Sequence, residues 1–331
     1  MRAILEPVGF QLAVAAGALA ALLVQRRCAR KNGLSAAASE WLAVLSLPLG
    51  VFFGHFLYAL VLYNAQPGDP TIAYLFKPWA GGFMFWGVAG GAMLACFLAN
   101  RLCKERFLPM MDTVAVALIV LVLVIRAAAP LDVTDGVSQG YGRPVGELLE
   151  AFGLEYREEA RYLPLFFAPE AEYAEDLNLS VWLLEAIWAG VILMMLLSGM
   201  EKRPAGKTSL MALILYAAGQ ILLEFLREDE HPKWLYVRVS QLLAAIVLAV
   251  VVICAVCRGK MNLRRSIVTG AGMLLSVGLI IFMAFMIEKP LILGDEVIFF
   301  PQWLVYISIT IAAAAMGILT WQSVYPLRGE P

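Results

Sequence analysis

The chain has 331 residues, of which 61% are hydrophobic and only 15% are charged. A water-soluble domain of this size does not carry so much apolar surface, so the composition excludes a soluble enzyme and predicts a protein embedded in lipid. The formal net charge of −1 shows no basic excess, and we expect no nucleic-acid partner.

Nine apolar runs divide the chain. A helix needs about 20 predominantly apolar residues to cross the hydrocarbon core of a bilayer, and each run is close to that length or longer. They predict an all-α, polytopic membrane bundle of about nine transmembrane helices. The runs cover residues 8–24, 41–63, 81–100, 110–130, 179–197, 209–226, 235–257, 267–287 and 297–321.

Basic residues predict how these helices are oriented. Clusters of arginine and lysine follow the first, third, fifth and seventh runs, and Arg328 follows the ninth. Because cytoplasmic loops carry the excess of basic residues, this alternation predicts that the N-terminus lies outside the cell. The first run is expected to be a retained helix, since its basic cluster follows it, whereas a cleavable signal peptide carries that charge before the apolar stretch.

Residues 131–177 differ from the rest of the chain. They contain eleven acidic residues and only three basic ones, without an apolar run. This composition predicts a soluble acidic insertion. The expected orientation places it outside the cell, together with the loop at residues 227–238, and a solvated loop is its default interpretation.

The stretch YAAGQILLEFLRED, residues 216–229, places polar side chains inside the sixth run. In a helix, Gln220, Glu224 and Arg227 occupy positions i, i+4 and i+7 and therefore share one face. Polar and ionisable groups inside a bilayer are costly unless they are paired or face a cavity, so this face predicts a functional site.

Other runs add polar side chains at a similar depth. His55, Arg126 and Glu185 lie in the expected external halves of the second, fourth and fifth runs. Two arginines among carboxylates suit an anion such as a lipid phosphate, because a guanidinium group binds phosphate through paired donors. The external half of the third run also holds a set of glycines, namely Gly81, Gly82, Gly87, Gly90 and Gly91.

Each of these residues also has a structural interpretation. Either arginine can extend to the interface, and Glu224 can pair with Arg227 three residues further on. His55 can bond a neighbouring helix, and the glycines can serve close helix packing. Cys254 and Cys257 have the spacing of a redox or metal motif, but they lack a second pair and a nearby histidine, so we expect no metal site and no cofactor.

Six segments of the chain resemble the prolipoprotein diacylglyceryl transferases. The last of them is similar to the family pattern Y-G-x-x-R-F-x-x-E-F-x-R-x-P-D. The resemblance covers about residues 5–255 and implies a bundle of seven membrane helices. We therefore expect a transferase-like membrane domain over residues 1–257 and two additional transmembrane helices over residues 258–331. The six segments are GHFLYALVLY (54–63), WAGGFMFWGVAGG (79–91), MDTVAVALIVLVLVIR (111–126), QGYGRP (139–144), SVWLLEA (180–186) and YAAGQILLEFLRED (216–229).

Members of this family move a diacylglyceryl group from phosphatidylglycerol to the thiol of a prolipoprotein lipobox cysteine. The resemblance implies these two substrates, and a location in the bacterial plasma membrane. It also implies that Arg126, Glu224 and Arg227 belong to the catalytic site, and His55 is a candidate base whose ordinary pKa of about 6.5 suits proton transfer. The expected substrate-binding residues are Tyr58, Gly81, Gly82, Gly87, Glu185 and Gln220.

The chain departs from the family pattern at several positions. Trp86 stands where the family has histidine, Gln220 where it has arginine, and Ala129 where it has asparagine. The leading hypothesis is a divergent phosphatidylglycerol–prolipoprotein diacylglyceryl transferase, and a non-catalytic relative that binds phospholipid or lipoprotein is the alternative. A transporter is disfavoured, because no internal repeat is visible and the polar groups lie on one side of the bilayer.

Overall fold

The computed structural model describes residues 2–65, 72–131, 141–144, 166–167, 178–199, 203–227, 233–234, 237–259, 261–288, 291–293, 296–298 and 301–325. Within these ranges eight helices are long and apolar enough to cross a membrane. One further apolar helix, Val181–Leu197, has 17 residues. Each apolar run of the sequence thus forms a helix, and the predicted all-α membrane bundle is confirmed.

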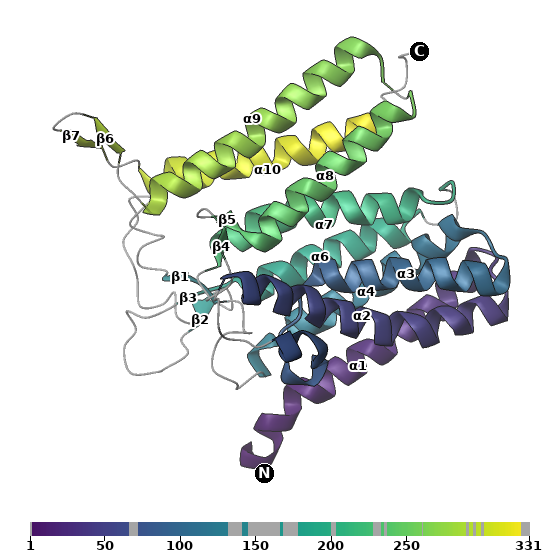
Figure 1. Ribbon diagram of the computed structural model, residues 1–331. Helices are drawn as coiled ribbons and strands as arrows, with labels where there is room; N and C mark the ends of the chain where they lie inside the picture. The colour runs from purple at the N-terminus through teal and green to yellow at the C-terminus, as the bar shows by residue number, and fades with distance from the viewer. Residues whose placement is uncertain are drawn as a thin grey trace. The chain divides into compact units, whose positions relative to one another are not determined.

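The long helices follow one another along the chain with short connections between most of them (Figure 1). Three 3₁₀ turns, η1 (Ile72–Phe76), η2 (Pro78–Ala80) and η3 (Ala129–Leu131), flank α3 and α4. The helices are α1 (Arg2–Lys31), α2 (Ala36–Ala65), α3 (Phe85–Cys103), α4 (Phe107–Ala127), α6 (Val181–Leu197), α7 (Lys207–Leu226), α8 (Val239–Cys257), α9 (Leu263–Glu288) and α10 (Gln302–Val324).

Short strands occupy parts of the connections. Three of them form an antiparallel sheet in the order β1-β3-β2, and the others pair as β4 with β5 and β6 with β7. Most of the predicted acidic insertion and much of the loop at 227–238 lie outside the described residues. The strands are β1 (Tyr141–Pro144), β2 (Phe166–Phe167), β3 (Asn178–Ser180), β4 (Lys233–Trp234), β5 (Val237–Arg238), β6 (Leu291–Leu293) and β7 (Glu296–Ile298).

Helices α3, α8 and α10 begin later than the apolar runs predict, and α8 begins at Val239 because Val237 and Arg238 pair with β4 as strand β5. Gly81 and Gly82 have φ angles of 84° and 76°, a left-handed conformation that glycine adopts without steric cost, and α3 therefore begins only at Phe85. The last helix begins at Gln302, because the residues at the start of the ninth run pair with β6 as strand β7.

The chain divides into two compact units. The first contains Met1–Gly140 and Trp182–Leu213, and the second contains Tyr141–Val181 and Ile214–Pro331. Helix α7 begins in the first unit and continues into the second. The division after residue 257 that the sequence suggests stays a prediction.

A seam of glycines joins α2 to α3 in the first unit. Gly54 of α2 faces Gly87 of α3, and Gly50 faces Gly91 one turn further along. A Cβ atom on Gly87 would overlap the backbone carbonyl of Phe53. The two backbones therefore approach as closely as they do because these positions carry no side chain.

Asp112 of α4 holds the start of α7. Its carboxylate is 4% exposed and accepts backbone hydrogen bonds from Gly206 at 2.6 Å and from Ser209 at 2.7 Å. A carboxylate at a helix N-terminus satisfies N–H groups that have no partner within the helix, and the helix dipole favours its charge. Asp112 thus fixes the start of α7 against α4 within the first unit.

In the second unit, α10 packs against α8 and α9 and also contacts α7. The rings of Phe225 and Tyr306 pack edge to face with centroids 5.6 Å apart, and a Cβ atom on Gly317 would lie 3.0 Å from Cβ of Ala218. The two C-terminal helices therefore support one side of α7. The buried cluster at this contact consists of Phe225, Met283, Val305, Tyr306 and Ile309.

Replacing Gly87 by alanine is expected to destabilise the protein, because the added methyl group meets the backbone of α2. Overpacking of this kind costs about 1–3 kcal/mol. Gly90→Ala is the matched control, since a Cβ atom at Gly90 has no atom within 4 Å. Thermal unfolding in detergent should show a lower midpoint for Gly87→Ala alone, and equal midpoints for the two variants would contradict the glycine seam.

Candidate functional site

Two polar side chains of α7 and a third directly after its last residue lie buried in the second unit. Gln220, Glu224 and Arg227 are 6%, 2% and 4% exposed. One carboxylate oxygen of Glu224, Oε1, lies 3.4 Å from Nε2 of Gln220 and 3.5 Å from Nη1 of Arg227. The pairing of Glu224 with Arg227 that their spacing predicts is confirmed.

A second arginine, Arg238, reaches the same carboxylate from the start of α8. Its Nη1 lies 3.8 Å from Oε2 of Glu224, and its Nη2 donates a hydrogen bond of 2.8 Å to the backbone carbonyl of Arg227. Gln241 fixes this helix start, because its Nε2 donates to the carbonyl of Ile221 at 2.8 Å and its Oε1 accepts from the Arg238 backbone N–H at 3.2 Å. We refer to Gln220, Glu224, Arg227, Arg238 and Gln241 as the α7–α8 polar cluster.

Arg238 was not among the site residues that the sequence predicts. It lies at the end of the polar loop 227–238 and in the first residues of the seventh apolar run, which suggests a loop charge, yet it is only 5% exposed. The sequence offered a weak signal in Gln241, because glutamine is typical of the third position of a capping box, but arginine is not among the usual capping residues.

The amide oxygen of Gln220 is buried without a hydrogen-bond partner among the described residues. A buried polar atom left in this way costs about 1–3 kcal/mol, and proteins keep few of them. A bound polar group or an ordered water at this position would recover that cost, which marks the side of α7 carrying Gln220 as a candidate ligand contact.

In the first unit, Arg126 and Glu185 form a short ion pair between α4 and α6. Nε of Arg126 lies 2.7 Å from Oε2 of Glu185, and the side chains are 22% and 9% exposed. Arg126 occupies the last turn of α4, where the helix dipole favours a cation. Because the contact uses Nε, the two Nη groups of the guanidinium remain as donors for an anion.

His55 is fully buried in α2, and both of its ring nitrogens face backbone carbonyl groups. Nδ1 lies 2.9 Å from the oxygen of Gly81 and 3.2 Å from that of Gly82, and Nε2 lies 2.8 Å from the oxygen of Tyr74. A base must present a nitrogen lone pair to the proton that it removes, and here each nitrogen is directed at a carbonyl oxygen. This geometry favours a structural role for His55, which holds η1 and the glycine loop against α2, and its role as a base stays a prediction.

The expected substrate-binding glycines differ in their surroundings. The ring of Tyr58 covers Gly82 so closely that a Cβ atom there would overlap it, and Gly87 is buried against the backbone of α2. A Cβ atom on Gly81, by contrast, would have no atom within 4 Å, and Gly81 borders a cavity. Of the three, Gly81 is therefore the one whose backbone a ligand can approach.

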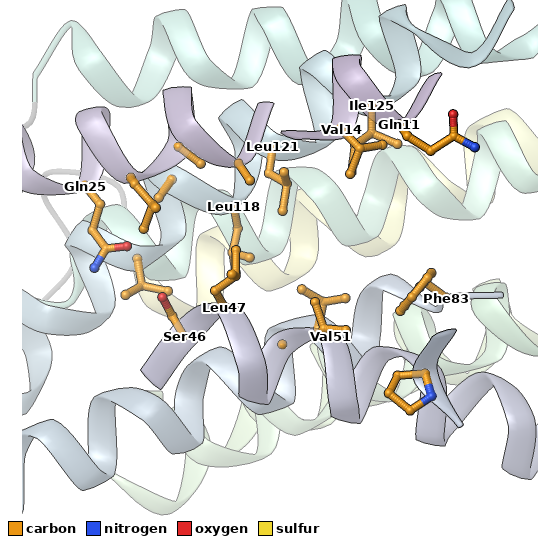
Figure 2. Close-up of a pocket in the computed structure, with 18 of the residues that line it drawn as sticks. Gln11, Val14, Gln25, Ser46, Leu47, Val51, Phe83, Leu118, Leu121 and Ile125 are labelled. Carbon is orange, nitrogen blue, oxygen red and sulfur yellow. The ribbon is translucent and has the colours of Figure 1, made fainter. Parts of the chain in front are cut away.

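That cavity is an elongated groove of about 650 Å³ between α1, α2 and α4, with Gly81 and Phe83 at its border. On α1 its lining runs from Phe10 to Gln25, a length of about 23 Å along the helix axis. Gln11 and Gln25 lie toward opposite ends of it, and apolar side chains line the middle (Figure 2). The apolar side chains that Figure 2 labels there are Val14, Leu47, Val51, Leu118 and Leu121.

The sequence analysis also expected Arg126 to face Glu224 and Arg227 in one site. Arg126 belongs to the first compact unit, whereas Glu224 and Arg227 belong to the second. Their common site stays a prediction. The structure describes one acid–arginine contact in each unit: the half-buried pair of Arg126 with Glu185, and the buried contact of Glu224 with Arg227 and Arg238.

The family model of the prolipoprotein diacylglyceryl transferases matches residues 8–257 of the chain. The chain belongs to this family. The match covers the apolar runs from the first to the seventh, and α9 and α10 lie beyond it.

Curated relatives are distant in sequence. The phosphatidylglycerol–prolipoprotein diacylglyceryl transferase of Oceanobacillus iheyensis is 21% identical over 252 residues, which cover 76% of this chain and 84% of that protein. The enzyme of the same name from Listeria welshimeri is 24% identical over 74% of this chain and 86% of its own length. That from Frankia alni is 27% identical over 72% of this chain and 59% of its own length.

Family membership and the apolar helices together show the cellular location and the class of the protein. It is a multi-pass protein of the bacterial plasma membrane in a family of lipoprotein-forming transferases. The predicted family and membrane location are therefore confirmed.

Replacing His55 by phenylalanine should loosen the segment from η1 to the glycine loop, because the ring would no longer bond the carbonyl groups of Tyr74, Gly81 and Gly82. Hydrogen exchange of residues 72–84 is expected to become faster. Tyr74→Phe is the comparison, since it keeps the backbone carbonyl that His55 contacts and removes only the long hydrogen bond of 3.4 Å from the Tyr74 hydroxyl to the Gly81 carbonyl, so a smaller effect on exchange is expected. Unchanged exchange in the His55 variant would show that the histidine does not hold this segment.

Proposed function

We propose that this protein transfers the diacylglyceryl group of phosphatidylglycerol to the lipobox cysteine of a prolipoprotein at the outer leaflet. The cysteine sulfur attacks the glycerol carbon that bears the phosphate, and the bond between that carbon and the phosphate oxygen breaks. The products are a thioether and glycerol phosphate. The thiol proton passes to the phosphate monoester or to solvent.

The buried contact between Glu224 and Arg227 carries this proposal. Both residues stand where the sixth apolar run resembles the family pattern, and both are almost completely removed from solvent. Preorganised donors in a site that excludes water stabilise a developing negative charge more strongly than donors in bulk water. The leaving phosphate gains negative charge as the bond to carbon breaks, which is the charge that a buried guanidinium stabilises.

Arg126 is proposed as a further anion-binding residue, with Glu185 as the residue that positions it. Oε2 of Glu185 lies 2.7 Å from Nε as an ion pair without aligned hydrogen-bond geometry, and so keeps the guanidinium at this place. A paired guanidinium edge matches two oxygens of a phosphodiester. The loop before α3 would contribute Gly82, which Tyr58 covers, and Gly81, which is open to the groove. Gly87 would keep α3 close to α2.

The groove between α1, α2 and α4 is proposed to accept an acyl chain of the phospholipid. Its lining is mostly apolar, and its length of about 23 Å on α1 exceeds the depth of about 15 Å of one leaflet's hydrocarbon, so the groove is long enough for an acyl chain that crosses the leaflet. Pockets for small molecules are generally apolar with few polar groups, and here those groups lie toward the two ends.

A non-catalytic phospholipid-binding relative is the second candidate. It is favoured by Trp86 and Gln220, which replace the histidine and arginine of the family pattern, and by the carbonyl contacts at both nitrogens of His55. Under this alternative the protein would bind phosphatidylglycerol and form no thioether.

Incubation of the purified protein with labelled phosphatidylglycerol and a lipobox peptide distinguishes the two candidates. We expect thioether product from the wild type and a reduction of about 100- to 1,000-fold in kcat for Arg126→Ala and for Arg227→Ala, the range seen when one oxyanion donor is removed. Arg101→Ala and Cys254→Ala are controls at exposed positions and should keep full activity. Lipid binding without thioether from folded wild-type protein would contradict the transferase proposal.

The acyl groove is tested by narrowing it. Ala18→Phe should raise the KM for phosphatidylglycerol, because the ring would fill the groove that an acyl chain is to occupy. Ala16→Phe adds the same ring to the exposed side of α1 and should leave KM unchanged. If the two variants had equal KM values, the groove would not be the acyl site.

A further inference from the structure

The start of α8 brings a second guanidinium group to the carboxylate of Glu224. Arg227 approaches Oε1 at 3.5 Å and Arg238 approaches Oε2 at 3.8 Å. Arg227 directly follows α7 and Arg238 directly precedes α8, and neither is more than 5% exposed. Two buried guanidinium groups thus share one buried carboxylate.

Gln220 reaches the same carboxylate from the α7 side. Its Nε2 lies 3.4 Å from Oε1 of Glu224, whereas Arg238 lies near Oε2. Gln220 and Arg238 therefore approach the two oxygens of the same carboxylate. The transferase pattern that this chain resembles has arginine at position 220, and here the side chain is neutral. A positive charge that α7 lacks at Gln220 is present on α8 at Arg238.

Arg238 is also held in a defined place. Its Nη2 donates to the carbonyl of Arg227 at 2.8 Å, and its backbone N–H donates to Gln241, whose own amide donates to Ile221 of α7. Charge-assisted hydrogen bonds have typical lengths of about 2.7–2.9 Å, whereas the distances from Arg227 and Arg238 to Glu224 are 3.5 and 3.8 Å. The guanidinium groups of Arg227 and Arg238 therefore lie near Glu224 at distances longer than those of close charge-assisted hydrogen bonds.

We infer that Arg238 is an anion-binding residue of this protein, which together with Arg227 binds the phosphodiester of the lipid substrate in place of an arginine at position 220. The inference rests on the proposed function for the identity of the lipid. Arginine suits this task because its planar donors match paired phosphate oxygens and because it stays charged when buried. The unpartnered amide oxygen of Gln220 lies in the same cluster and can accept a hydroxyl group of the ligand.

A purely structural role for Arg238 makes a different prediction. In that case the residue matters for its hydrogen bond to the Arg227 carbonyl, which joins α8 to α7, and its positive charge is incidental. An arginine at position 220 would then be unable to replace it, because a side chain on α7 does not restore a bond between the helices.

The test moves the charge from one position to the other. Arg238→Gln removes the charge from α8, and the double variant Gln220→Arg/Arg238→Gln restores a charge from α7. Arg264→Gln, at an exposed position of α9, controls for the loss of an arginine. Each protein is assayed for the midpoint of thermal unfolding, for phosphatidylglycerol retained in native mass spectrometry, and for the rate of thioether formation.

We expect Arg238→Gln to weaken phosphatidylglycerol retention at least tenfold and to lower kcat/KM about 100-fold, with the double variant regaining at least a tenth of wild-type kcat/KM and most of the lipid. Arg264→Gln should match the wild type in all three assays. A double variant that unfolds at the wild-type temperature but binds no more lipid than Arg238→Gln would overturn the inference, as would unaltered lipid retention in Arg238→Gln.

The lipid-binding assay separates this inference from the proposed function. If the wild type forms no thioether but Arg238→Gln loses phosphatidylglycerol and the double variant recovers it, Arg238 is an anion-binding residue and the transferase proposal fails. If thioether forms at equal rates in the wild type and in Arg238→Gln, the transferase proposal stands and the inference about Arg238 fails.

Discussion

The carboxylate of Glu224 is the constraint on which the second unit depends. A carboxylate that is only 2% exposed inside a membrane protein requires nearby donors, since an uncompensated buried charge is strongly destabilising. Gln220 and Arg227 meet this need from α7 itself, and Arg238 does so from α8. The end of α7 and the start of α8 are therefore fixed by one group, and α10 supports α7 through Phe225 and Tyr306.

The first unit is organised by close backbone contact instead of by charge. Glycines at the α2–α3 seam let the two helices meet, and His55 anchors the loop that precedes α3 by contacting three backbone carbonyl groups. This loop borders the groove between α1, α2 and α4 at Gly81. The same unit carries the Arg126–Glu185 pair, so it contains both an apolar groove suited to an acyl chain and a guanidinium suited to phosphate.

Much of the fold followed from the sequence, because a helix that crosses lipid must be apolar over its whole length. The i, i+3 spacing was also enough to predict the pairing of Glu224 with Arg227. The start of α3 was not predicted, because the hydropathy of Gly81 and Gly82 carries no information about their positive φ angles. Arg238 and the carbonyl contacts of His55 escaped prediction for a related reason: both depend on residues distant in sequence, which periodicity along one helix does not reveal.

The central claim, that this divergent chain forms a thioether on a prolipoprotein, is tested most directly in cells. A lipobox-containing prolipoprotein would be coexpressed with the protein in bacteria depleted of their own diacylglyceryl transferase, and its intact mass would be measured. The account predicts a mass increase equal to one diacylglyceryl group on the lipobox cysteine. An unmodified prolipoprotein, with the protein present and folded in the membrane, would contradict it.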